Sequence, residues 1–160
     1  FSVPAAMAGF FAAGIHLTRL AGWQVPRVRR VPLLWILHFG YLWIVLGYLL
    51  SGLTSLGLLP GSSAVHAFAV GGIGVVIYGM ISRVSLGHTG RRLRPSFWTV
   101  LGFVLILLAS ASRVIASIPG HGLYQSLLIF SGFSWIGGFA LFVINYMPIL
   151  FRPRLDGQDG

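Results

Sequence analysis

The sequence predicts an all-α integral membrane protein with five transmembrane helices, because composition and charge placement agree. The chain is 56% hydrophobic and 8% charged, whereas soluble domains carry about 25% charged residues. Its eleven basic residues are all Arg, and ten of them lie in three clusters between apolar runs. Residues 33–58, 61–82, 97–112 and 114–151 carry no charge. This alternation is typical of a chain that crosses a membrane several times.

Each apolar run is close to the roughly 20 residues that a helix needs to cross the hydrocarbon. The runs lie at about 1–22, 33–58, 62–85, 97–118 and 122–150. We therefore expect one five-helix transmembrane domain over residues 1–151, followed by a short cytoplasmic tail at 152–160. Pro32 is placed to open the second helix. Ser62 and Ser63 are placed to cap the third helix, and Ser96 to cap the fourth.

The positions of the arginines predict the orientation. Cytoplasmic loops of membrane proteins are enriched in Lys and Arg. The loops after the first and third spans and the C-terminal tail are therefore expected in the cytoplasm, and the first residue in the periplasm. The chain starts at Phe1 inside an apolar run, which suggests part of a longer protein.

The residues that are missing exclude several functions. The net charge of +9 does not indicate nucleic-acid binding, because each basic cluster caps an apolar run and forms no basic polar face. The chain has no Cys, so disulfides, thiolate metal sites and a cysteine nucleophile are excluded. Its two acidic residues, Asp156 and Asp159, are both in the tail. Carboxylate-driven catalysis is therefore not expected, and whether the chain is an enzyme stays open.

Small and polar residues form one stripe on each of the last three spans, at about 100° per residue. Such stripes are expected to face protein and to form helix-packing seams. They comprise Gly71, Gly74, Tyr78, Ser82 and Ser85, then Thr99, Gly102, Ile106, Ser110, Arg113 and Ser117, and finally Leu127, Ser131, Ser134, Gly138, Leu141 and Asn145.

Two histidines lie at matched depth on neighbouring spans. His16 is near the cytoplasmic end of the first span and His38 near the cytoplasmic start of the second, both roughly 6–8 Å below one surface. Antiparallel helices could bring them to one metal ion, or to opposite faces of one haem. His38 also shares a helix face with Tyr41, Tyr48 and Gly52. The alternative is that each histidine is an ordinary hydrogen-bonded polar residue.

The outer side carries a second candidate group, formed by His66, Arg113 and His121. Arg113 is the one arginine outside the clusters and lies about a turn from the outer end of the fourth span. It either snorkels outward along its own helix or pairs with an anion from outside the chain, such as a cofactor propionate, a lipid headgroup or a partner's carboxylate. His88 is expected in the cytoplasmic loop, in a local turn or as a ligand.

Several segments resemble the NnrS family. They are Pro-Leu-Leu-Trp-Ile-Leu-His-Phe-Gly-Tyr at 32–41, His-Ala-Phe-Ala-Val-Gly at 66–71, Arg-Val-Ser-Leu-Gly-His-Thr-Gly-Arg at 83–91 and Tyr-Met-Pro-Ile-Leu-Phe-Arg-Pro at 146–153. The resemblance covers residues from about 23 to 154. It carries over His38, His66 and His88 as family histidines, and Arg83 and Arg91 as family arginines.

The resemblance implies a multi-pass protein of the bacterial inner membrane that contains haem b and copper and is linked to nitric-oxide tolerance and denitrification. Members of the family usually have about a dozen spans, so this chain resembles the C-terminal five. The resemblance makes His38, His66 and His88 candidate metal ligands. Two further residues are candidates for cofactor binding: His16, because of its depth in the membrane, and Arg113, because it lacks an acidic partner in the chain.

Two other functions stay open. One is a non-catalytic transmembrane subunit or assembly module that packs against the remaining helices of a longer protein or against partner membrane subunits. The other is a small-solute transporter, which the sequence favours less because broken helices carrying intramembrane charges are not evident.

Overall fold

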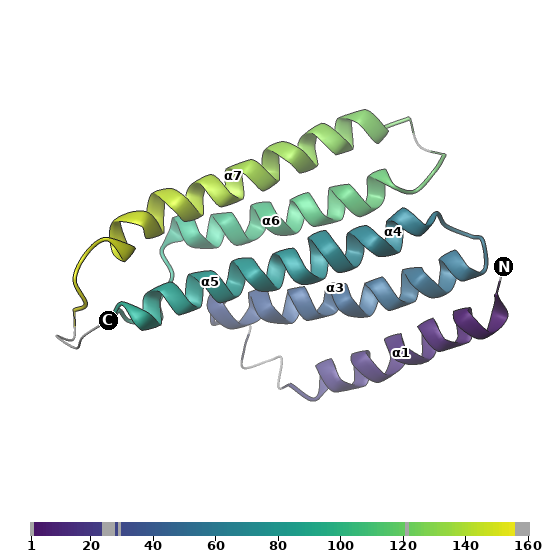
Figure 1. Ribbon diagram of the computed structural model, residues 1–160, viewed down its shortest axis with the longest axis horizontal. Helices are drawn as coiled ribbons and strands as arrows, with labels where there is room; N and C mark the ends of the chain where they lie inside the picture. Colours follow the sequence, from purple (N-terminus) through teal and green to yellow (C-terminus); the bar gives the residue numbers. More distant parts are fainter. Residues whose placement is uncertain (1, 24–27, 29, 121, 156–160) are drawn as a thin grey trace.

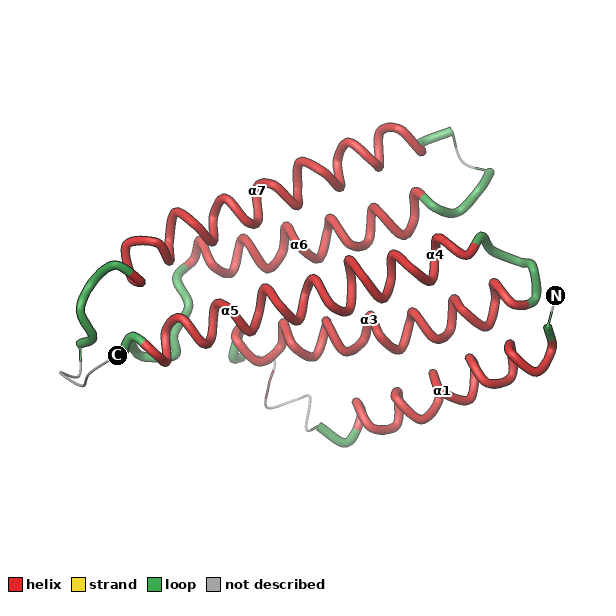
Figure 2. Tube along the Cα trace, viewed as in Figure 1, coloured by secondary structure: helices red, strands yellow, loops and turns green. Residues whose placement is uncertain are grey.

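The structure, a computed structural model, describes residues 2–23, 28, 30–120 and 122–155. Within these residues the chain is helical and contains no strand (Figure 2). Five helices are long and apolar enough to cross a membrane, which confirms the predicted fold class. They are α1 (Val3–Ala21), α3 (Pro32–Ser55), the continuous span Gly61–His88, α6 (Phe97–Ala116) and α7 (Tyr124–Leu150).

The five spans lie side by side in chain order, from α1 at one edge to α7 at the other (Figure 1). Successive spans run antiparallel, so the connections alternate between the two ends of the bundle. The last turn of α1, the first turn of α3, the connection before α6 and residues 151–155 after α7 all lie at one end, which we call the arginine-rich end. The assignment of this end to the cytoplasm stays a prediction.

Local sequence explains where several helices begin and end. Pro32 occupies the first turn of α3, and the Oγ of Ser96 accepts a hydrogen bond from the Thr99 N–H at 3.2 Å, as predicted. After α3 the chain turns at Gly57, whose φ of 75° favours glycine. The Leu58 N–H donates to the Leu53 carbonyl at 3.0 Å, which closes the helix end. The helix consequently ends at Ser55, before the predicted limit of 58.

Two details of the third span differ from expectation. Neither Ser62 nor Ser63 caps it, because Pro60 is the N-cap residue and no side chain caps that end. Ser63 is instead buried and accepts a hydrogen bond from the Ser117 hydroxyl at 2.8 Å. At the other end the helix continues to His88, which is therefore the last residue of a helix and not a loop residue.

The third span changes its winding in the middle. An α-helical start, α4 (Gly61–His66), continues into the π-helix η1 (Ala67–Gly74) and then into α5 (Val75–His88). Aromatic rings from two other spans lie against this segment: Trp43 of α3 contacts Gly71, and Trp135 of α7 contacts Gly74. π-helical turns are rare and occur frequently at functional sites.

The predicted seams face the interior. In α6, Thr99, Gly102, Ile106 and Ser110 are all buried, and the glycine and serine positions of the neighbouring spans follow the same pattern. Serine hydroxyls bridge helices across the seams. Hydrogen bonds link Ser110 to the Val70 carbonyl at 3.1 Å and Ser131 to the Ala109 carbonyl at 2.8 Å. In hydrocarbon, such interhelical hydrogen bonds hold helices together where the hydrophobic effect does not.

Candidate cofactor site

His38 has the hydrogen bonding of a metal-binding histidine. It lies in the second turn of α3, and its Nδ1 is 2.9 Å from the Leu34 carbonyl oxygen. A carbonyl only accepts, so Nδ1 carries the proton and the lone pair of the neutral ring is on Nε2. Metal-binding histidines are commonly oriented by a backbone carbonyl in this way.

The other nitrogen of that ring has no partner. The Nε2 of His38 is buried and makes no hydrogen bond within the part of the chain that the structure describes. A buried polar atom without a partner costs about 1–3 kcal/mol, and native proteins rarely retain one without a reason. A metal bound at Nε2 would remove this cost.

His16 lies on α1 and faces the same region of α3. Its Nδ1 is 2.6 Å from the Tyr41 hydroxyl oxygen, and its ring stacks on Tyr48 with centroids 5.1 Å apart and planes 9° apart. The predicted shared face of His38, Tyr41, Tyr48 and Gly52 is therefore the face that packs on α1. If Tyr41 donates to Nδ1, the proton of the His16 ring is on Nε2. If the ring donates to Tyr41, Nε2 is free to bind a metal.

Trp23 links His38 to Tyr41, which in turn contacts His16. Its ring centroid lies 5.5 Å from that of His38 and 4.5 Å from that of Tyr41. His38, Trp23, Tyr41, His16 and Tyr48 thus form a continuous series of ring contacts, which we call the aromatic row. The contact of Trp23 with His38 depends on the packing of α1 against α3 and is not visible in the sequence of either helix alone.

The other halves of α1 and α3 are held in close backbone contact. A Cβ atom on Gly9 would lie 2.9 Å from the Gly52 backbone nitrogen, so only glycine fits there. The Ser2 N–H also donates to the Ser55 carbonyl at 3.0 Å. This close approach fixes α1 against α3 and so positions His16 beside Tyr41 and Tyr48.

Two of the three outer candidates, His66 and Arg113, lie near each other. His66 ends α4 directly before the π-helix, and the Arg113 guanidinium is close enough to act on it electrostatically. Arg113 also lines an open groove of about 440 Å³, whose other walls include Val70 of η1 and Trp135 of α7. The third predicted member, His121, lies outside the described residues.

The structure separates the candidate histidines into three places. In the span Gly61–His88, His66 lies near the start, at the end of α4, and His88 is the last residue. His38 belongs to the aromatic row on α3. Among the described residues no three His, Asp or Glu side chains form a group that could hold a metal ion. A single metal site built from His38, His66 and His88 is therefore incompatible with this fold.

The family assignment agrees with this membrane architecture. A family model described as NnrS protein matches residues 1–154. The chain belongs to the NnrS family. The resemblance seen in individual segments begins at about residue 23, whereas the family match begins at residue 1. The match therefore includes α1, the helix that carries His16. No curated protein and no solved structure matches the chain.

Proposed function

We propose that this NnrS chain holds a haem b or a copper ion through His38 and acts in nitric-oxide tolerance in the bacterial inner membrane. Family membership and the resemblance supply the haem, the copper and the nitric-oxide link. The buried, unpartnered Nε2 of His38 is the structural observation that carries the proposal. Its Nδ1–H, held by the Leu34 carbonyl, orients the ring for binding through Nε2.

The surrounding residues suit a haem better than a copper ion bound by this chain alone. A haem would be held through His38, and His16 is a second candidate residue for holding it if the proton of the His16 ring is on Nδ1. Copper would need further ligands from other helices or a partner chain, since the described residues gather no third metal-binding side chain. A bound haem iron or copper would supply one-electron chemistry and a position for a diatomic ligand.

The chain's own residues provide an apolar setting for such a group. The described spans contain no carboxylate, because both acidic residues lie at 156 and 159. Nitric oxide is neutral and partitions into hydrocarbon, so its entry needs no polar path. These helices therefore favour binding of a neutral diatomic molecule over a reaction that consumes protons delivered by carboxylates.

An absorption spectrum of the purified protein tests the proposed function. We expect a Soret band that shifts when nitric oxide is added, or copper in a fixed ratio to protein by elemental analysis. A preparation with neither a Soret band nor copper would remove the cofactor proposal.

His66 and Arg113 form a separate outer pair in this proposal. Counted from the helix ends at the arginine-rich end, Arg113 lies on the order of 15 Å deeper than His38. We propose that Arg113 pairs with an anion from outside the chain, such as a cofactor propionate or a partner's carboxylate, because the described residues offer it no carboxylate.

Replacement of Arg113 by Leu is expected to lower cofactor retention or the association with partner helices. The reason is that the variant leaves the bound anion without its cation in a medium of low dielectric constant. Cofactor content and co-purifying membrane proteins measure the effect, and Arg113→Lys, which keeps the charge, is the control. If Arg113→Leu matches the wild type in both measurements, Arg113 is a snorkelling side chain only.

The exposure of the edge helices favours a second candidate, a non-catalytic membrane subunit or assembly module. Only 22% of the apolar membrane-spanning stretch of α1 and 17% of that of α7 is buried inside the protein, whereas 50% of that of α6 is buried. Both edges of the bundle can therefore accept further helices. A stable complex with partner membrane proteins, isolated without haem or copper, would favour this candidate.

A further inference from the structure

The groove that Arg113 lines opens between η1, α6 and α7 and has a volume of about 440 Å³. It lies toward the end of the bundle opposite the arginine-rich end, which we call the outer end, because Arg113 is in the last turn of α6. One wall belongs to the π-helix η1, and π-helical turns occur frequently at functional sites. The groove is therefore a candidate binding site.

The positive charge of the groove lies at its outer end. Leu128, the first α7 residue of the lining, is near the start of α7 at the same end of the bundle. The Ser131 hydroxyl donates to the Ala109 carbonyl at 2.8 Å, which shows how α6 and α7 are aligned. Because these helices run antiparallel, Arg113 is about level with Leu128.

The rest of the groove is apolar and runs toward the middle of the membrane. From Leu128 to Ile136 the lining descends about 12 Å along the axis of α7. Trp135 and Val70 add further apolar surface. The hydroxyl of Ser131 is already engaged with a backbone carbonyl of α6. The groove thus has a cation at the end of a span and an apolar wall that extends inward from it.

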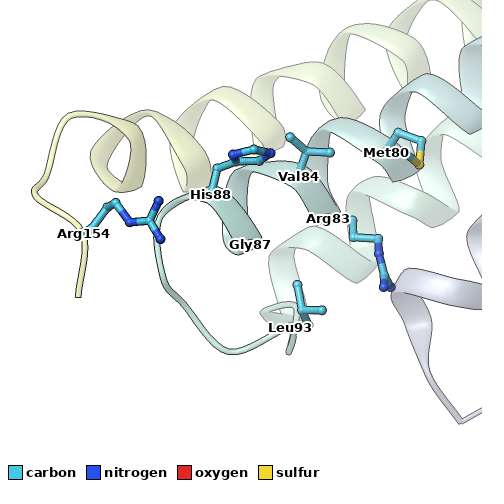
Figure 3. A pocket seen from close by; sticks show the side chains of 7 residues that line it. All are labelled: Met80, Arg83, Val84, Gly87, His88, Leu93 and Arg154. Carbon is cyan, nitrogen blue, oxygen red and sulfur yellow. The ribbon is translucent and has the colours of Figure 1, made fainter. Parts of the chain in front are cut away.

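Arg113 has no anionic partner in the described part of the chain. Both acidic residues lie beyond it, at 156 and 159. The neighbouring His66 is neutral or cationic, so it cannot balance the charge. The pocket in Figure 3 gathers its basic side chains at the arginine-rich end, and Arg113 is the only described arginine at the outer end. It is half-buried, so an external anion would stabilise it.

We propose that this groove binds an anionic phospholipid, with the phosphate on Arg113 and an acyl chain along Trp135 and Ile136. The inference rests on the proposed pairing of Arg113 with an external anion and names the molecule that supplies the anion. The end of a membrane span is the level of lipid phosphates, and the apolar wall runs inward from there as an acyl chain does. One guanidinium matches the single charge of a phosphodiester and can bind two of its oxygens.

Other occupants use less of the groove. A free phosphate ion offers the same headgroup chemistry but would leave the apolar wall uncovered. The groove also lies on the edge of the bundle that α7 forms, where only 17% of the membrane-spanning stretch is buried. A lipid held there would contact any helix that packs on α7, so its loss would weaken the association with such a helix.

Gly132 leaves the middle of the groove wall open. A Cβ atom there would meet nothing within 4 Å. A larger side chain at this position therefore fits the fold and fills the groove. Because glycine is unfavourable in a helix, Gly132→Leu is expected to leave the stability of α7 unchanged or to raise it. This variant blocks the acyl chain without removing a charge.

The test uses the purified, delipidated full chain in neutral detergent. Its thermal unfolding is followed with added phosphatidylglycerol, phosphatidylcholine or inorganic phosphate. We expect phosphatidylglycerol to raise the melting temperature in a saturable way, and the other two to leave it nearly unchanged. An equal shift with phosphatidylcholine would show that the net charge of the lipid is not recognised. An equal shift with inorganic phosphate would show a soluble-anion site. Either result would overturn the proposal.

Variants locate the effect. Arg113→Gln should weaken phosphatidylglycerol binding by ~10-fold, because it removes charge-assisted hydrogen bonds. Gly132→Leu should weaken binding with the charge intact. Arg92→Gln is the matched control, because Arg92 is exposed at the arginine-rich end. Retained binding in Gly132→Leu, or an equal loss in Arg92→Gln, would show general charge attraction and contradict a defined site.

Failure of the lipid assignment can be told from failure of the proposed role of Arg113. If phosphatidylglycerol leaves the melting temperature of the wild type unchanged while Arg113→Leu still loses cofactor or partner helices, the lipid assignment is wrong. Another external anion then pairs with Arg113. If phosphatidylglycerol binds as expected while Arg113→Leu keeps its full cofactor content, the lipid phosphate is the anion and a cofactor propionate is excluded.

Discussion

Replacement of His38 by Ala is expected to remove the bound haem or copper from the protein. The variant deletes the Nε2 that the fold buries without a partner and the Nδ1–H that the Leu34 carbonyl holds. Even loss of an orienting group around a ligand costs about 10–100-fold in metal affinity, and loss of the ligand itself costs more. The ratio of Soret absorbance or metal content to protein measures the effect.

Two further variants separate ligand loss from misfolding. His38→Asn keeps an N–H that can donate to the Leu34 carbonyl but has no imine nitrogen, so it should also lose the cofactor while keeping its helical circular dichroism. His88→Ala alters the last residue of α5, which does not belong to the aromatic row, and should retain the cofactor. Full cofactor content in His38→Ala would exclude His38 as a ligand.

Replacement of Gly102 by Ala is expected to destabilise the helix bundle by about 2–4 kcal/mol. A Cβ atom on Gly102 would collide with the Tyr78 hydroxyl. Tyr78 is fully buried and donates a hydrogen bond to the Gly138 carbonyl at 2.7 Å. The collision displaces the ring, breaks that hydrogen bond and disturbs the contact of Tyr78 with Phe103.

Unfolding in a denaturing detergent, followed by circular dichroism, measures this loss. Gly132→Ala is the matched control, because a Cβ atom at Gly132 of α7 meets nothing within 4 Å. The control should be as stable as the wild type, or slightly more stable through the better helix propensity of Ala. Equal stability of Gly102→Ala and Gly132→Ala would show that Tyr78 does not hold α5 between α6 and α7.

The sequence was sufficient to predict the five spans and the seams between them. Both depend on patterns within one helix: a length of apolar residues, and the spacing of Ser and Gly along one face. Thr99, Gly102 and Ser110 therefore proved to be buried as expected. The face shared by His38, Tyr41 and Tyr48 was predicted for the same reason.

Features that depend on neighbouring helices were not predictable in this way. The π-helix η1 is packed against Trp43 and Trp135, which belong to different spans. The hydrogen bond between Ser117 and Ser63 joins residues far apart in the sequence, so Ser63 was mistaken for a cap. A periodic pattern along one helix carries no information about such contacts.

The candidate site shows the same division. Depth alone predicted that His16 and His38 lie on one level, but it could not show that ring contacts through Trp23 and Tyr41 link them. Nor could it show which nitrogen of His38 is free, because that depends on the rotamer that brings Nδ1 to the Leu34 carbonyl. The sequence thus predicted His38 as a candidate, and the structure shows that Nε2 is its unpartnered nitrogen.

The measurement that tests the central claim most directly is the magnetic coupling between the bound metal and histidine nitrogen. Protein labelled with ¹⁵N-histidine is brought to its paramagnetic state and examined by electron–nuclear double resonance. We predict a strongly coupled histidine nitrogen in the wild type. In the fraction of His38→Asn that still contains the cofactor, one such coupling should be missing. Identical histidine couplings in the wild type and in His38→Asn would contradict the assignment of His38 Nε2 as a metal ligand.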